Sequence, residues 1–331
     1  MLEWSDDLKI FDCSLYLDSC TPRGLCFISH AHSDHIGIHN SVIATAATAA
    51  LTEHRLGPQS VTELEFGAHH SIDAATEVSL LSAGHILGSA MLYVRRSGGS
   101  LLYTGDFKLR SSLTVPPATP VKADVLVMES TYGQPHFRFP PWQEVAAQLV
   151  ELVSDALRAG RQPIVMGYSL GKAQEIVRIL TDAGITVTCH GAIVSMNGIY
   201  ERFGVRVGAV RRYRVEDFHG TSALDLQERG VLVAPPQVAR TAFVTRFDNP
   251  CRIMMTGWSL LKNAIYRYGV DHALPLSDHA DFDELMELIE RVEPRKIYTH
   301  HGYREFVNIL KSRGHNAELA RPDEQLLLFP E

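Results

Sequence analysis

The chain has 331 residues, of which 45 % are hydrophobic and 21 % charged, and its formal net charge is -7. This composition is that of a globular protein with one large domain or two smaller ones. It has no run of about 18 apolar residues and no amino-terminal secretory signal, so we expect no membrane span and a cytoplasmic location. The five cysteines are odd in number and form no CxxC pair, which argues against a disulfide framework and thiolate zinc sites.

Short apolar runs that are typical of strands alternate with amphipathic helical patterns along the chain, which predicts an α/β protein. The strand-like runs lie at residues 25–28, 78–81, 100–104, 124–128, 163–166, 185–188, 252–255 and 296–299. The helical patterns are clearest over residues 142–157, 172–180, 282–289 and 305–310.

The first strand-like run that bears on function ends in a loop with four candidate metal ligands, namely His30, His32, Asp34 and His35. Alternate residues of a strand point the same way, so His30 and His32 can share one side, and the other two follow as the loop turns. Imidazole together with carboxylate suits zinc or a similar first-row ion, and one such loop can serve two adjacent ions. The alternative is a polar surface loop that happens to be rich in histidine.

Two later loops add further candidates. His85 is flanked by small residues after the run at 78–81, and Asp106 follows the run at 100–104 in a Gly-Asp pair. Taken singly, such a histidine is more often structural and such an aspartate is usually part of a turn. A carboxylate in this position can also bridge two cations. The occurrence of all these residues in order favours a metal site.

The segment Gly167-Tyr168-Ser169-Leu170-Gly171 fits the pattern G-x-S-x-G between a strand and a helix. This is the context of the nucleophile in α/β-hydrolases, so a serine hydrolase is a formal alternative. It would leave the clustered histidines and aspartates unexplained, and no clear oxyanion motif precedes it.

The middle of the chain contains an arginine cluster with interleaved aromatic residues, between Arg202 and Arg214. Such a run is either a solvated face or a patch that contacts phosphates. The candidate catalytic residues lie before and after this stretch. We therefore expect one catalytic domain, residues 1–165 and 251–331, that is interrupted by an insertion at residues 166–250.

Six short motifs, spread from the first candidate loop to residue 302, resemble those of a known family. The first three resemble the metallo-β-lactamase fold, and the last three resemble motifs A, B and C of the β-CASP nucleases. They are HxHxDH at 30–35, Gly-His at 84–85, Gly-Asp at 105–106, Glu-Ser-Thr-Tyr-Gly at 129–133, Ser-Asp-His-Ala-Asp at 277–281 and His-His-Gly at 300–302. The resemblance implies an αββα sandwich with a smaller inserted β-CASP α/β domain.

The resemblance also implies two divalent metal ions, with zinc first and manganese as the alternative on the same ligands. One ion would be held by His30, His32, His85 and Asp106, and the other by Asp34, His35, Asp106 and His301. Asp106 would then bridge the ions. His300 is an alternative to His301, which we favour because the family's ligand directly precedes a glycine.

The catalytic residues implied by the resemblance are Asp34, Glu129 and His279. A hydroxide shared by the two cations would attack the phosphodiester, and His279, oriented by Glu129, would donate a proton to the leaving oxygen. Asp281 is better explained as the cap of a helix that begins near Phe282.

The compact length, with the elements at 171–175 and 257–258, resembles most the small bacterial exonucleases associated with DNA ligase, often labelled mRNA 3'-end processing factors. This resemblance implies a single-strand-preferring DNA exonuclease, 5'-to-3', that works in DNA repair with a ligase or helicase system. A histidine at motif C is more typical of the RNA-acting branch, so an RNA-processing nuclease is the alternative. A thioesterase- or glyoxalase-like metallohydrolase and an inactive scaffold are more distant alternatives.

We expect nucleic acid to be bound in the middle of the chain, where phosphates can meet the free N–H groups of a helix start and guanidinium groups. The expected substrate-binding residues are Ser169, Lys172, Arg211, Arg212 and Arg214.

Overall fold

The computed structural model describes residues 2–4, 7–10, 13–217, 225–247 and 249–320. The chain forms two compact units. The first comprises Met1–Ser111, Val115–Arg138 and His279–Glu331, and the second comprises Ser112–Thr114 and Phe139–Asp278.

The first unit contains two mixed sheets. One sheet has the order β1-β2-β3-β4-β5-β6, with antiparallel pairing from β1 to β3 and parallel pairing from β3 to β6. Its strands are β1 (Leu2–Trp4), β2 (Leu8–Ile10), β3 (Leu15–Leu17), β4 (Leu25–Phe27), β5 (Ser41–Ala44) and β6 (Val61–Glu63). Helix α1 (Ala46–Leu56) contacts β6.

The other sheet has the order β19-β18-β11-β10-β9-β8-β7. Pairing is antiparallel from β7 to β10 and parallel from β10 to β19. The strands are β7 (His69–Asp73), β8 (Thr76–Ser82), β9 (Ala90–Arg96), β10 (Gly99–Tyr103), β11 (Val125–Glu129), β18 (Lys296–His300) and β19 (Ala317–Leu319).

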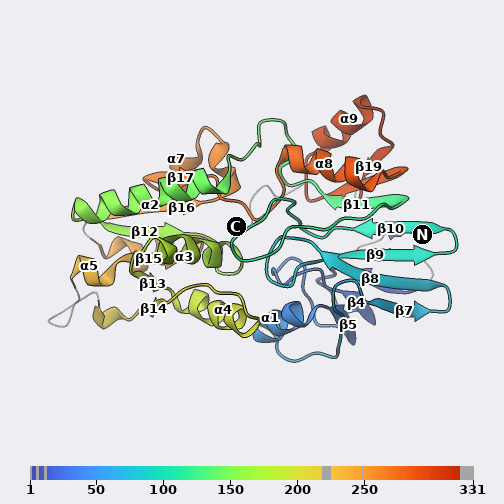
Figure 1. Cartoon of the computed structure of the whole chain (residues 1–331), viewed down its shortest axis with the longest axis horizontal. Helices are drawn as coiled ribbons and strands as arrows, with labels where there is room; N and C mark the ends of the chain where they lie inside the picture. The colour runs from blue at the N-terminus through green and yellow to red at the C-terminus, as the bar shows by residue number, and fades with distance from the viewer. Residues whose placement is uncertain (1, 5–6, 11–12, 218–224, 248, 321–331) are drawn as a thin grey trace. The chain divides into compact units, whose positions relative to one another are not determined.

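The two sheets of the first unit enclose an apolar core, because strand residues alternate between faces. Phe27 and Ile43 of the first sheet pack in one cluster with Leu80 and Leu101 of the second. The other face of the second sheet packs against α8 (Phe282–Val292) and α9 (Arg304–Ser312), which lie beside it in Figure 1. The expected αββα layering is confirmed.

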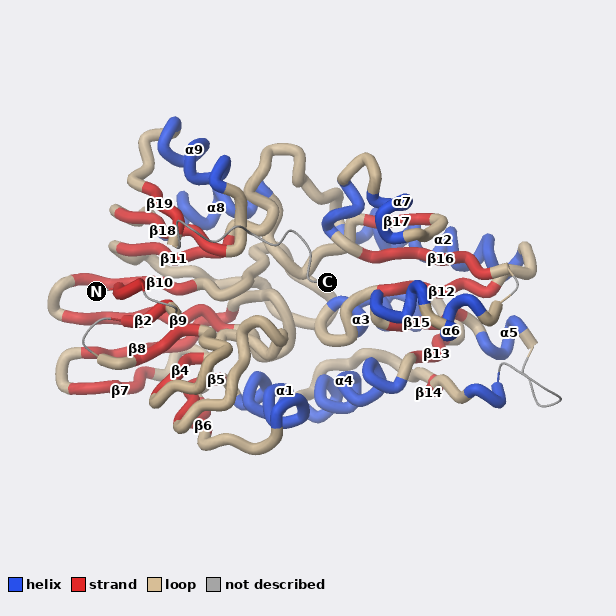
Figure 2. The backbone as a smooth tube through the Cα atoms, turned by 180° about the vertical axis from the view of Figure 1, so that it is seen from behind, coloured by secondary structure: helices blue, strands red, loops and turns tan. Residues whose placement is uncertain are grey.

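The second unit is built on a wholly parallel sheet with the order β14-β13-β15-β12-β16-β17, which is red in Figure 2. Its strands are β12 (Gln162–Met166), β13 (Val187–Cys189), β14 (Arg211–Arg212), β15 (Val231–Ala234), β16 (Pro250–Met255) and β17 (His272–Leu274). Its α-helices are α2 (Trp142–Arg158), α3 (Lys172–Asp182), α4 (Gly191–Arg202), α5 (Leu226–Arg229), α6 (Ala242–Thr245) and α7 (Ala264–Tyr268). Short 3-10 helices are η1 (Val215–Asp217), η2 (Pro236–Arg240) and η3 (Gly257–Leu260).

The second unit is larger than the insertion expected at residues 166–250. Strand β12 ends at residue 166, and it pairs on one side with β15 and on the other with β16. Helix α2 contacts β12, and β17 pairs with β16. Strands β12, β16 and β17 lie wholly or mostly at the borders of the expected insertion or outside it, but they belong to the same sheet as β13, β14 and β15, which lie within it.

None of the helices in the described part of the chain is long and apolar enough to cross a lipid bilayer.

Candidate metal centre

The histidine-rich loop follows the carboxyl end of β4, an inner strand of the first sheet. The ladder continues past the strand, because the Ile28 N–H donates to the carbonyl of Ile43 at 3.0 Å. His30 and His35 are buried, whereas the side chain of Asp34 is 65 % exposed. The loop therefore presents candidate ligands of two kinds, buried and solvent-facing.

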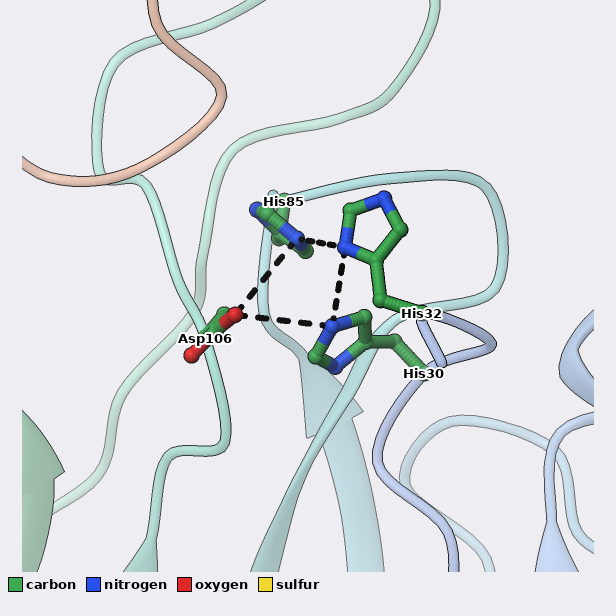
Figure 3. Close-up of side chains that lie close together, drawn as sticks. All are labelled: His30, His32, His85 and Asp106. Atoms are coloured by element: carbon green, nitrogen blue, oxygen red, sulfur yellow. Dashed lines mark hydrogen bonds and ion pairs between the residues drawn. The ribbon is translucent and has the colours of Figure 1, made fainter. Parts of the chain in front are cut away.

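A first group of four donors surrounds a common space, as Figure 3 shows. His32 Nδ1 lies 3.1 Å from His30 Nε2 and 3.0 Å from His85 Nε2. Asp106 Oδ2 lies 3.5 Å from His30 Nε2 and 3.8 Å from His85 Nε2. Ligands about 2.0 Å from a tetrahedral zinc ion would be about 3.3 Å apart, so these spacings fit a first-row cation.

His85 owes its position to the glycine before it. Gly84 has a φ of +72°, and a Cβ on it would lie 2.3 Å from the carbonyl oxygen of Lys108. The Lys108 N–H in turn donates to the Ala83 carbonyl at 2.9 Å. Only glycine lets the two loops, each of which carries a candidate ligand, approach this closely.

A second group contains Asp34, His35 and His301, whose donor atoms lie within 4.8 Å of one another. His35 Nε2 is 3.8 Å from Asp34 Oδ2 and 3.4 Å from Asp106 Oδ2. Asp106 thus lies within reach of both groups. The ring of His300 instead stacks on Tyr103, with 5.6 Å between centroids.

The electrostatics of these residues favour a cation. Burial, His35 and His85 hold the pKa of His30 well below its usual value, which favours the neutral ring that metal binding requires. Burial alone would raise the pKa of Asp106, but His35 and His279 outweigh burial and hold the pKa well below the usual range. Among the described residues, no group donates a hydrogen bond to the buried Asp106 Oδ1. The residues present therefore fit bound divalent ions.

Asp18 completes this centre, although the sequence did not single it out. Its Oδ2 accepts hydrogen bonds from His35 Nδ1 at 2.9 Å and from the Tyr103 hydroxyl at 2.8 Å, and its Oδ1 accepts from the Ser29 N–H at 2.6 Å. Burial would lower the pKa of His35, but Asp106 and Asp18 raise it well above its usual value. A carboxylate on Nδ1 fixes the tautomer and aims Nε2 at Asp106. The available signal was a carboxylate directly after β3, which runs parallel to β4.

Glu129 and His279 lie together beside Asp106. Both carboxylate oxygens of Glu129 are 3.0 Å from His279 Nδ1. The Phe107 N–H donates to Oε1 at 2.8 Å and the Thr131 hydroxyl donates to Oε2 at 2.6 Å. Glu129 is fully buried, so its orientation is fixed from both sides.

The loop that carries His279 is anchored by its neighbours. Asp281 caps α8 as predicted, because its side chain accepts the N–H of Glu284 at 3.0 Å. Arg110 donates to the same side chain at 2.5 Å. The Ala280 N–H donates to the Phe107 carbonyl at 2.7 Å, which links this loop to the one that carries Asp106.

The substrate-binding residues expected from the sequence fall at different places in the second unit. Lys172 is buried, and its ammonium group donates to Asp278 Oδ1 at 2.8 Å. Ser169 lies in the turn before α3, and no described histidine makes a hydrogen bond with its hydroxyl, which argues against a serine hydrolase. Arg211, Arg212 and Arg214 are exposed, the first two on the edge strand β14.

Comparison with known proteins adds a family match. The model described as Zn-dependent metallo-hydrolase RNA specificity domain matches residues 267–318. A protein of Opitutus terrae described as a probable DNA ligase is 36 % identical over 99 % of the chain and 32 % of its own length. The 5' exonuclease Apollo of Gallus gallus is 27 % identical over 82 % of the chain and 57 % of its own length. An RNase J-like protein of Methanocaldococcus jannaschii is 24 % identical over 84 % of the chain and 81 % of its own length.

The αββα sandwich with its histidine and aspartate loops at the strand ends defines the metallo-β-lactamase fold. Within that fold, the chain belongs to the β-CASP nuclease family, which the family match and these relatives support. The chain spans about a third of the Opitutus protein and less than two thirds of Apollo.

Proposed function

We propose that this chain is a metal-dependent phosphodiesterase that acts on nucleic acid. The observation that carries the proposal is the position of Asp106, which belongs to the first donor group, lies 3.4 Å from His35 of the second, and lies beside the Glu129–His279 pair. The relatives include proteins named as DNA- and RNA-acting enzymes, which supports nucleic acid as the substrate class. We also propose that residues 139–278 are the inserted β-CASP domain.

Two divalent ions, zinc first and manganese as the alternative, would be held by the residues that the sequence singles out. His30, His32, His85 and Asp106 would hold one ion, and Asp34, His35, Asp106 and His301 the other. Bound cations would supply an activated water and offset the charge that develops on the phosphate oxygens. Asp18 would keep His35 in the tautomer that leaves Nε2 available to an ion.

The chain's own contribution to bond cleavage is a proton. Glu129 accepts the Nδ1 proton of His279, so the opposite nitrogen, Nε2, is the one that can donate to the leaving oxygen. The buried carboxylate stabilises the positively charged ring, which is the form that can donate. Because Phe107 and Thr131 hold Glu129, the ring cannot turn without losing this contact.

Single-stranded DNA is the proposed substrate, degraded 5'-to-3' in a repair process that also involves a DNA ligase. The support is the relative described as a DNA ligase, which matches nearly the whole chain, and the relative named as a 5' exonuclease. RNA is the second candidate, since the family match is described as an RNA specificity domain and another relative as RNase J-like. The cytoplasmic location stays a prediction.

Side-by-side digestion of end-labelled single-stranded DNA and RNA by the zinc- or manganese-loaded chain tests this function. We expect both the 5'-labelled and the 3'-labelled DNA to show that degradation starts at the 5' end. Faster cleavage of RNA would favour the second candidate. If protein with full metal content cleaves neither polymer, the proposed nuclease activity is refuted.

Arg211, Arg212 and Arg214 are proposed to bind the phosphate backbone, because they are exposed while the chain as a whole is negative. Replacing all three with Ala should weaken binding of long single strands. The log-log salt slope should flatten by about one unit for each phosphate contact removed. An unchanged slope would make the cluster a solvated face.

A further inference from the structure

The turn between β12 and α3 holds an exposed aromatic side chain. Tyr168 is 45 % exposed, although only Gly167 separates it from the end of a fully buried strand. The turn lies at the carboxyl edge of a parallel sheet, where open α/β sheets bind their ligands. Trp258 on η3 follows the end of β16, the parallel neighbour of β12, at the same edge.

This turn is held in one conformation by side-chain hydrogen bonds. Gln174 Oε1 accepts the Gly171 N–H at 2.7 Å, and Gln174 Nε2 donates to the Ser169 carbonyl at 3.1 Å. The same amide nitrogen also lies 2.9 Å from Asn197 Oδ1. Gln174 is fully buried, so Tyr168 is carried on a rigid support.

A buried cation also lies against the Tyr168 ring. The ammonium group of Lys172 is 5.0 Å from the ring centroid, and it is fixed there by Asp278 at 2.8 Å. A cation at this distance is attracted to the ring face, so the ring is oriented as well as supported. A large part of the residue nevertheless faces solvent.

The segment that follows the neighbouring strand is electropositive. From Thr256 to Val270 it contains two basic residues, Lys262 and Arg267, and no acidic residue, in a chain whose net charge is -7. Lys262 in this segment is exposed. An exposed, rigid aromatic ring next to local positive charge is the arrangement on which single-stranded nucleic acids stack their bases.

We propose that Tyr168 is a stacking platform for a nucleobase of the bound single strand. The inference rests on the proposed function and specifies one contact of that substrate. Every base has a π-face, so such a contact adds affinity without sequence preference. It also gives the G-x-S-x-G segment a use that needs no serine nucleophile.

The test is a double-mutant cycle, in which the side chain of Tyr168 and the bases of the strand are removed separately and together. The dissociation constant of a fluorescent poly-thymidine strand is measured with the full-length, metal-loaded chain carrying His279→Ala, which limits cleavage. This dissociation constant is compared with that of a strand of equal length built from abasic units. Each strand is measured with Tyr168, Tyr168→Phe and Tyr168→Leu.

Phe66→Leu is the matched control. Phe66 is 48 % exposed and lies between β6 and β7 of the first unit, outside both the candidate metal centre and the arginine cluster. It should bind both strands like the parent.

We expect Tyr168→Leu to weaken binding of the thymidine strand about tenfold and to leave abasic binding unchanged, while Tyr168→Phe binds like the parent. Equal weakening on both strands, or none on either, would overturn the stacking contact while leaving the nuclease proposal intact. A parent that binds neither strand would refute the proposed function itself. A melting temperature within the parent's range excludes misfolding, and Tyr168→Phe retains the ring if Tyr168→Leu fails this criterion.

Discussion

Replacing His279 with Ala should remove the proposed proton donor and leave the candidate metal ligands in place. His279 lies near Asp106, with 3.9 Å between its Nδ1 and Asp106 Oδ2, but the same nitrogen is closer to both oxygens of Glu129, at 3.0 Å. After the replacement Glu129 keeps its hydrogen bonds from Phe107 and Thr131, so no buried carboxylate is left without a donor. The side chain of His279 is 20 % exposed, which limits the packing that is lost. We therefore expect a folded, metal-containing variant.

The expected loss in turnover is about a hundredfold to ten-thousandfold, which is typical of a general acid. At about 1.36 kcal/mol for each factor of ten, this corresponds to about 2.7 to 5.4 kcal/mol in the activation barrier. The loss should shrink on a thymidine 5'-phosphodiester of 4-nitrophenol. Nitrophenolate leaves without a proton, whereas the sugar oxygen of a strand needs one.

Single-turnover rates on a single strand and on the nitrophenyl ester give the two losses, and elemental analysis gives the metal content. His54→Ala serves as the matched control, since His54 is an exposed histidine on α1 of the same unit. An equal loss on both substrates would mean that His279 does not donate the proton. Loss of metal would assign His279 to the metal centre instead.

Three further replacements test other parts of the first unit. Asp106→Ala should abolish activity and lower the metal content, since Asp106 Oδ2 lies 3.5 Å from His30 of the first donor group and 3.4 Å from His35 of the second. Full metal content in an active variant would refute the proposed bridging role. Gly302→Ala would place a Cβ 1.9 Å from Ser130 Oγ and 2.2 Å from the Ser130 carbonyl, so unfolding should become easier by about 1 to 3 kcal/mol, as measured by denaturant titration. Burial would raise the pKa of Asp7, but hydrogen bonds from nearby hydroxyls and from Arg23 outweigh it and lower the pKa. The Asp7→Asn variant should therefore be less stable than the parent at neutral pH, and the gap in melting temperature should close as the pH falls below about 3.9.

The sequence located α2, α3, α8 and α9, but not α1 or α4, and it located the loops of the candidate ligands, because these features are encoded locally. The pattern at residues 142–157 matches α2, Trp142–Arg158, and that at 282–289 matches α8, Phe282–Val292. The candidate ligands cluster because each lies in a loop that follows a strand, β4 of the first sheet or β8, β10 or β18 of the second. The last three strands run in the same direction, so their loops lie at one edge of that sheet. Their roles as ligands stay a prediction that metal analysis will test.

The extent of the second unit and the surroundings of Lys172 depend on contacts that are remote in sequence. The apolar run of β12 predicts a strand but not the sheet to which it belongs, which its pairing with β15 and β16 determines. Lys172 carries a positive charge at a helix start, which predicts a phosphate contact, but its partner is Asp278, more than a hundred residues away. Asp18 was missed for the same reason, since the residue that it orients, His35, lies in another loop.

Phe107 shows how the metal centre and the proton donor are joined. It directly follows Asp106, its N–H donates to Glu129 Oε1, and its carbonyl accepts from Ala280, the residue after His279. One peptide segment therefore fixes the shared carboxylate, the orienting carboxylate and the loop of the acid. A displacement of Asp106 would move the acceptor of the His279 proton as well. Because these groups are tied through the backbone, side-chain replacement at Phe107 alone would leave the link in place, and only changes that shift the Asp106 loop would disturb both parts together.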